Sequence, residues 1–205
     1  MTTSTHRGRT RLHSERGQSI VEMAIVMPLL ILVSLGVIET SFALLDQHVV
    51  TKLAREGSNL ISRDTTIQQA ANVLTTMSST PVNFSNGDST VIFSVLMKGG
   101  ATGTTNFGQV VLFQRASFGT FPATSRLTAA GGSYGGPPEY LAANPDTNAG
   151  LQVTNVPDSI INVNGGFLYV TEVFTRHNLL TGIDGFLPPL FRVLVPRTLY
   201  SIAYF

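Results

Sequence analysis

Hydrophobic side chains fill one long run near the start of the chain. No charged residue occurs in the 16 residues from Met23 to Ile38, and past Glu39 the apolar run continues to Leu45, which gives 23 positions. At about 1.5 Å per helical residue these positions span roughly 35 Å, and the hydrocarbon core of a bilayer is about 30 Å thick. The pattern therefore predicts one transmembrane helix at about residues 23–45.

The charges before this run indicate its orientation. Residues 1–17 contain four arginines and one glutamate, a net charge of +3, whereas the rest of the chain carries −2. A basic end before an apolar run normally stays in the cytoplasm, so the segment predicts membrane topology and not a nucleic-acid partner. A cleaved secretory signal peptide is the alternative, but the run is too long and no Ala-x-Ala-like site follows it. We expect a single retained span.

After the span the pattern becomes amphipathic. Leu45, Val49, Leu53 and Leu60 recur at helical spacing among charged residues, so one continuous helix is predicted from about residue 18 to residue 62. A second, shorter helix is predicted for residues 65–79, with Asp64 as its N-cap and Pro81 beyond its end. The apolar face expected for this second helix consists of Ile67, Ala70, Ala71, Leu74 and Met77.

Beyond residue 82, short β-forming runs alternate with turn residues. Asn86-Gly87 is a hairpin-turn signal, and Pro196 divides the last run or places part of it at a sheet edge. The predicted strands are residues 90–96, 107–118, 167–174 and 191–205. We therefore predict an α+β fold, in which a long N-terminal helix (18–63) precedes an extracytoplasmic domain (64–205) whose short helix packs on an antiparallel sheet.

Residues 119–150 differ in composition from the rest of this domain. These 32 residues include six glycines and four prolines, several of them adjacent. Such a segment is typical of a long loop, partly mobile or ordered on assembly.

One match to a catalytic motif occurs in this loop. Gly131-Gly132-Ser133-Tyr134-Gly135 has the Gly-x-Ser-x-Gly spacing of a nucleophile elbow, and Asp158 and His177 follow in a permitted order. The elbow requires a strand before the serine and a helix after it, whereas glycine and proline surround Ser133. A hydrolase is therefore the weaker interpretation of this segment.

Metal-binding signals are also weak. Asn144, Asp146, Asn148 and Gly150 suggest an oxygen-ligand calcium loop, but the glycine is misplaced for an EF-hand, and Asn-Pro-Asp is ordinary turn chemistry. The four histidines, His6, His13, His48 and His177, show no metal-ligand spacing, and the chain has no cysteine. No metal, cofactor or catalytic site is predicted.

Two carboxylates, Glu22 and Glu39, flank or interrupt the apolar run. A carboxylate deep in a membrane costs a few kcal/mol and normally marks a partner or a function. Glu39 is near the outer end, where we expect water, or Lys52 or Arg55 of a neighbouring subunit, to reach it.

The sequence before Glu22 explains the other carboxylate. Arg16-Gly17-Gln18-Ser19-Ile20-Val21-Glu22, followed by the apolar run, resembles the processing site of type IV pilin-like proteins. The resemblance implies that a prepilin peptidase cuts between Gly17 and Gln18, which makes Glu22 the fifth residue of the mature chain. The new amine on Gln18 and the Glu22 carboxylate, of the same or an adjacent subunit, would then neutralise each other among apolar side chains.

A second block narrows the resemblance. Ala54-Arg55-Glu56-Gly57, together with Glu39 and the Glu22 context, resembles the signature of TadE-like proteins of tight-adherence (Tad) pilus systems. The similarity covers residues 16–63, about a quarter of the chain. Met23 departs from the family, in which an aromatic residue often follows the glutamate.

This resemblance implies an assembly protein and not an enzyme. It implies a minor pilin or pseudopilin that enters or primes a Tad-type pilus used in adhesion, with Pro28 marking a point where the helix loosens. Its implied partners are the prepilin peptidase, other pilin subunits, the pilus assembly platform and lipid of the bacterial inner membrane. The outer domain would lie in the periplasm or on the assembled pilus. The alternative is a permanently anchored periplasmic binding module outside any filament.

Overall fold

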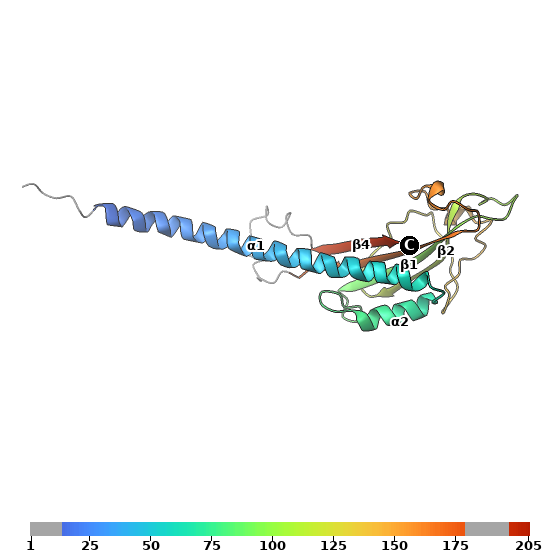
Figure 1. The fold of residues 1–205 in the computed structure, drawn as a ribbon, viewed down its shortest axis with the longest axis horizontal. Coiled ribbons are helices and arrows are strands. Elements are labelled where there is room, and N and C mark those ends of the chain that lie inside the picture. Colours follow the sequence, from blue (N-terminus) through green and yellow to red (C-terminus); the bar gives the residue numbers. More distant parts are fainter. Residues whose placement is uncertain (1–13, 179–196) are drawn as a thin grey trace, which may run out of the picture.

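A long N-terminal helix dominates the computed structural model, which describes residues 14–178 and 197–205 (Figure 1). Helix α1 (Ser14–Ile61) is 48 residues long and continues through Pro28. Its first half projects from the rest of the molecule, and its second half packs on a small domain (Figure 1). The predicted continuous helix is confirmed, with its start in the structure four residues earlier than expected.

The second helix is shorter than predicted and is capped differently. Helix α2 (Ile67–Met77) begins with a capping box, in which Thr66 accepts from the Gln69 amide and Gln69 accepts from the Thr66 amide. Asp64 is not the N-cap; its φ of 58° places it in the turn before the helix. The apolar face includes Ile67, Ala70, Ala71 and Leu74, which are buried, but the prediction for Met77 was wrong because its side chain is exposed.

Four antiparallel strands form one sheet in the order β2-β1-β3-β4. Their bounds are β1 (Ser89–Lys98), β2 (Val110–Gly119), β3 (Phe167–Arg176) and β4 (Thr198–Tyr204). The α+β fold is therefore confirmed. Asn86-Gly87 forms a turn, with Gly87 at a φ of 87°, but no strand precedes it among the described residues, so the hairpin prediction was wrong. The predicted strand residues 191–196, including Pro196, lie outside the described residues.

Different parts of the chain cover the two faces of the sheet. Val91 and Phe93 of β1 lie in a hydrophobic cluster with the second half of α1 and with α2. Leu96 and Val110 lie in a second cluster, completed by side chains from residues 127–161. The short 3-10 helices η1 (Ala149–Leu151) and η2 (Asp158–Ile160) belong to this cover. The sheet is thus buried between helices on one face and irregular chain on the other.

The glycine-rich segment 119–150 is part of this cover. It forms bridges between Gln114 and Leu141 and between Tyr134 and Ala142, and the Ala142 amide donates to the carbonyl of Phe113. These contacts also protect the outer edge of β2. The composition predicted a loop correctly, but it gave no indication that the loop packs on the sheet.

A buried carboxylate connects this cover to the sheet. Glu172 of β3 is 0% exposed, and its Oε1 accepts from the Arg126 amide at 2.8 Å and from the Tyr200 hydroxyl at 3.1 Å. The Ser125 hydroxyl is a third hydrogen-bond partner. Because a buried carboxylate needs several donors, Glu172 fixes the loop and β4 to the central strands.

These contacts make the stability of the folded chain sensitive to pH in the alkaline range. Burial, followed by the charge and hydrogen bond of Glu172, raises the pKa of Tyr200 above its ordinary value of 10. The folded state therefore favours the neutral phenol, and this stabilisation is complete below about pH 10 and is lost as the pH rises through the folded pKa. We expect the free energy of unfolding of the full chain in detergent micelles to fall above about pH 10, and to fall less steeply in Tyr200→Phe. Equal slopes for Tyr200→Phe and wild type in pH-dependent denaturant titrations would contradict this interpretation.

Candidate assembly and processing region

The first half of α1 has little contact with the rest of the described chain. Most of its large apolar side chains from Ile20 to Leu45 are at least 40% exposed, and Leu32 and Leu35 are half-buried. Gly17–Ile61 is a helix apolar and long enough to cross a membrane, with a mean hydropathy of 2.5 in its most apolar window. So many exposed apolar side chains are unfavourable in water. This half of α1 therefore requires lipid or neighbouring helices around it.

The predicted processing residues lie on this exposed part of the helix. Gly17 is the fourth residue of α1, at the end of its first turn, and a Cβ added there would have no atom within 4 Å. The Gln18 side-chain amide donates to Glu22 Oε1 at 3.2 Å, and both residues are exposed. Glu22 is therefore accessible to an incoming cation. Cleavage after Gly17 and pairing of Glu22 with the Gln18 amine remain predictions.

Glu39 is arranged differently from our expectation. It is 3% exposed, which contradicts the expected access to water, and its Oε1 lies 3.9 Å from Nε2 of His177. The other ring nitrogen of His177, Nδ1, is 2.9 Å from Asp46 Oδ2. His177, predicted to be isolated, therefore connects the end of β3 to two carboxylates of α1. The assembly role of Glu39 stays a prediction.

The Ala-Arg-Glu-Gly block divides into buried and exposed residues. Ala54 and Gly57 are buried against the sheet, and a Cβ on Gly57 would lie 2.7 Å from Thr171 Cγ2 and 3.1 Å from a ring carbon of Phe93. Arg55 is exposed and Glu56 is half-buried. Only glycine at position 57 allows the helix to approach β1 and β3 this closely, so half of the signature has a packing reason.

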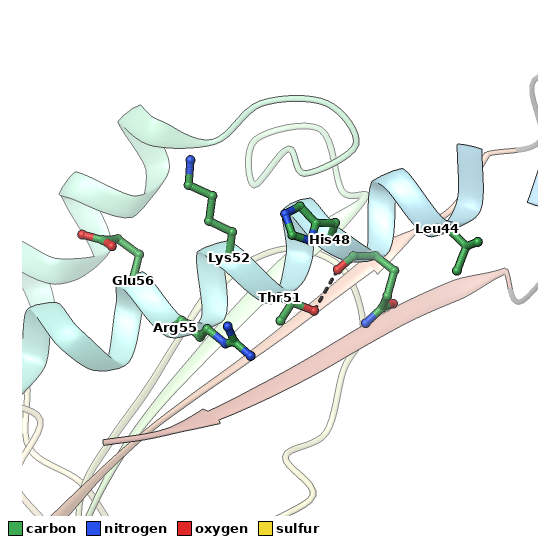
Figure 2. A pocket seen from close by; sticks show the side chains of 7 residues that line it. Leu44, His48, Thr51, Lys52, Arg55 and Glu56 are labelled. Carbon is green, nitrogen blue, oxygen red and sulfur yellow. Dashed lines mark hydrogen bonds between the residues drawn. The ribbon is translucent and has the colours of Figure 1, made fainter. Parts of the chain in front are cut away.

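The exposed half of the signature borders two shallow depressions. The first, of about 560 Å³, is lined by α1 residues only, and Figure 2 shows Lys52 and Glu56 projecting from the helix there. Thr51 donates to the carbonyl of Gln47 at 2.8 Å within this stretch. The second, of about 270 Å³, lies between Arg55, Glu56 and the end of β4. Mixed positive and negative side chains on an open helix face are compatible with the polar, solvent-accessible rim of a protein interface.

The residues of the nucleophile-elbow match are not brought together. Ser133 is exposed, and neither a strand nor a helix flanks it. Asp158 accepts from the Val110 amide at 3.2 Å, while His177 contacts Asp46 and Glu39. The serine has no adjacent base among these residues, so the elbow interpretation was wrong.

The possible calcium loop is built from turn contacts. Asn148 caps η1 by accepting from the Gly150 amide, and Asn144 adopts a left-handed φ of 53°. Asn106, which the sequence gave no reason to select, donates to the carbonyls of Pro145 and Asn148 at 2.7 and 2.9 Å. Within residues 14–178 and 197–205, no group of three or more His, Asp or Glu side chains could hold a metal ion.

These features define a class of protein with one candidate membrane helix that continues without a break into a small α+β domain. A family model described as "TadE-like protein" matches residues 17–59, which include Glu22 and the Ala-Arg-Glu-Gly block. The match covers 43 of the 205 residues and confirms the resemblance found in the sequence. No curated protein and no solved structure matches the chain.

Proposed function

We propose that this protein is a minor pilin or pseudopilin of a Tad-type pilus. The prepilin peptidase removes residues 1–17 on the cytoplasmic face of the inner membrane, and α1 then holds the subunit in the bilayer with the domain in the periplasm. The same helix packs against helices of other subunits when the chain enters, or primes, a pilus used in adhesion. Close packing and polar pairs drive such association in a membrane.

One observation carries this proposal. The apolar half of α1 exposes most of its large apolar side chains, with Glu22 exposed among them, and the family match falls on this same helix. A helix needed only as an anchor does not require a carboxylate at the membrane edge, whereas an assembling helix gains a polar pair from it. The accessible position of Glu22 supports a partner from outside the chain.

The N-terminus of the protein from its native host tests the proposal. Mass spectrometry should find a mature chain that begins at Gln18, and the chain should be present in sheared surface appendages as well as in membranes. A chain that begins at Met1 or Thr2 and stays in the membrane fraction would instead support a permanently anchored periplasmic binding module.

Glu22→Ala separates processing from assembly. We expect the variant to lose its leader normally, because the cut lies a full helical turn away, and to enter filaments at least about tenfold less, the loss that a single buried charge pair of about 1.4 kcal/mol would cause. The measurement is immunoblotting of sheared and membrane fractions. Asp64→Asn is the control, since it removes an exposed carboxylate outside the membrane at a left-handed position that asparagine tolerates. Wild-type amounts of Glu22→Ala in filaments would show that the pair is unnecessary.

A further inference from the structure

A third depression lies far along the chain from the helix signature. It has a volume of about 710 Å³ and is formed by β1, β2 and the segment 123–140. Ser94 pairs with Arg115 and Ile92 with Ser117 in the sheet register, so Ile92, Arg115 and Ser117 lie on one face. Phe93, which points to the opposite face, packs near Gly57 of α1. The depression therefore opens on the face of the sheet away from α1.

Arg115 is the charged group in this depression. Its Nε donates to Ser94 Oγ at 3.1 Å, and its Nη2 donates to Ser125 Oγ at 2.9 Å. No carboxylate oxygen of a described residue lies within 4.0 Å of its guanidinium nitrogens, and Nη1 has no hydrogen bond to a described residue. Two serines thus hold the guanidinium plane in place and leave donors for a ligand.

The surroundings of Arg115 favour a bound anion. Burial lowers the pKa of Arg115, which Tyr134 and Glu172 partly oppose. Glu172 reaches Arg115 through Ser125 rather than by direct contact. A fixed guanidinium with free donors binds a carboxylate in a two-point geometry, and this bond strengthens when water is partly excluded.

The remaining lining residues are rich in hydroxyl groups. Besides Arg115, the polar side chains are Ser117, Thr124, Ser125, Thr128 and Tyr134, and no acidic side chain lines the depression among the residues that the structure describes. Tyr140 adds an aromatic ring, whose hydroxyl is already bonded to Gln68 at 2.6 Å. The Ser125 hydroxyl is already bonded to Arg115 and Glu172, and the other hydroxyls match those of a sugar, while a ring packs on its C–H face.

From these observations we infer that this depression, the Arg115 pocket, binds a saccharide that carries one carboxylate. The single cation matches one negative charge, and the hydroxyl groups match a polyhydroxylated ring. The volume of about 710 Å³ lies within the usual range of small-ligand sites, about 300–1,000 Å³, and admits one or two sugar units. Because the pocket faces away from α1, helix packing between subunits leaves it accessible.

Binding to the purified full chain in detergent micelles tests this inference. Galacturonic acid is titrated by calorimetry against three comparisons: galactose, acetate and buffer. We expect galacturonic acid to bind at least tenfold more tightly than galactose, which lacks the carboxylate, and than acetate, which lacks the ring. Galactose binding as tightly as galacturonic acid, or acetate binding as tightly, would overturn the assignment of an acidic saccharide.

Three variants connect such binding to the pocket. Arg115→Gln should weaken binding of galacturonic acid at least tenfold, whereas Arg63→Gln, which removes an exposed arginine at the end of α1, should change it less than twofold. Arg115 also bonds Ser94 and Ser125, so Ala123→Phe, which fills the pocket and leaves Arg115 in place, provides a second test and should also abolish binding. Unchanged binding in Ala123→Phe would overturn the inference. Neither result depends on leader removal or filament entry, so the inference and the proposed function fail separately.

Discussion

Gly17→Leu is expected to abolish removal of the leader. A Cβ at position 17 meets no atom of the chain within 4 Å, and alanine or leucine is a better helix former than glycine by up to about 1 kcal/mol. The substitution therefore leaves the fold of this protein intact, and its effect falls on the peptidase, whose cleft must accept the residue before the cut. Mass spectrometry should find the full-length chain with all four leader arginines.

Two controls make this experiment specific. Gly17→Ala adds the smallest side chain and should already slow processing, while Gly8→Ala makes the same change within the leader and should leave processing unchanged. A Gly17→Leu chain that still begins at Gln18 would contradict the predicted cleavage site. It would also remove the reason for placing Glu22 one helical turn from a new amine.

Gly57→Val is expected to destabilise the folded domain by about 3 kcal/mol, at the upper end of the usual cost of overpacking a core. The first added carbon already collides with Thr171 Cγ2 at 2.7 Å and with Phe93 at 3.1 Å, and both partners are buried on central strands. The helix cannot move away without exposing Ala54 and the core around it. Denaturant titration of the full chain in micelles, followed by near-ultraviolet circular dichroism, measures the loss.

Removing Thr171 Cγ2, the atom that a side chain at position 57 would contact, provides the control for this prediction. Gly57→Ala should destabilise less than Gly57→Val, and adding Thr171→Ser, which removes Cγ2, should restore part of the loss. Gly136→Ala changes a glycine with nothing within 4 Å and should have little effect. Additive effects of Gly57→Ala and Thr171→Ser would mean that the close approach is not the cause.

Periodic patterns in the sequence predicted most of the fold. The apolar run and the spacing from Leu45 to Leu60 predicted α1, because a helix repeats its buried face every 3.6 residues. The β-rich runs predicted the bounds of β1, β2 and β3 within about three residues, whereas β4 begins seven residues after the predicted start at residue 191. The cap of α2 was missed because Asp64 and Thr66 are both good cap residues, and the reciprocal contact with Gln69 decides between them.

Long-range polar contacts could not be predicted in the same way. His177 and Asp46 are 131 positions apart, and nothing in either local sequence indicates that they meet. Glu172 occupies an alternating position on a strand, where a solvent-facing residue is the ordinary expectation, and a loop covers it only in the folded chain. The processing residues follow the opposite logic. The proposed peptidase would read them in sequence, so Gly17 and Glu22 can be predicted without a fold.

Because α1 is continuous from Glu22 to Gly57, it fixes the rotation of the α+β domain about the helix axis. Each helical residue turns the chain by about 100° and advances it by about 1.5 Å, so the side of the rod that carries Glu22 determines which way the sheet faces. A single-residue insertion near residue 33, before the helix contacts the domain at Glu39, would rotate the domain by more than a quarter turn and shift it by only about 1.5 Å along the helix axis. Such an insertion would make the Arg115 pocket face a different direction around the helix axis.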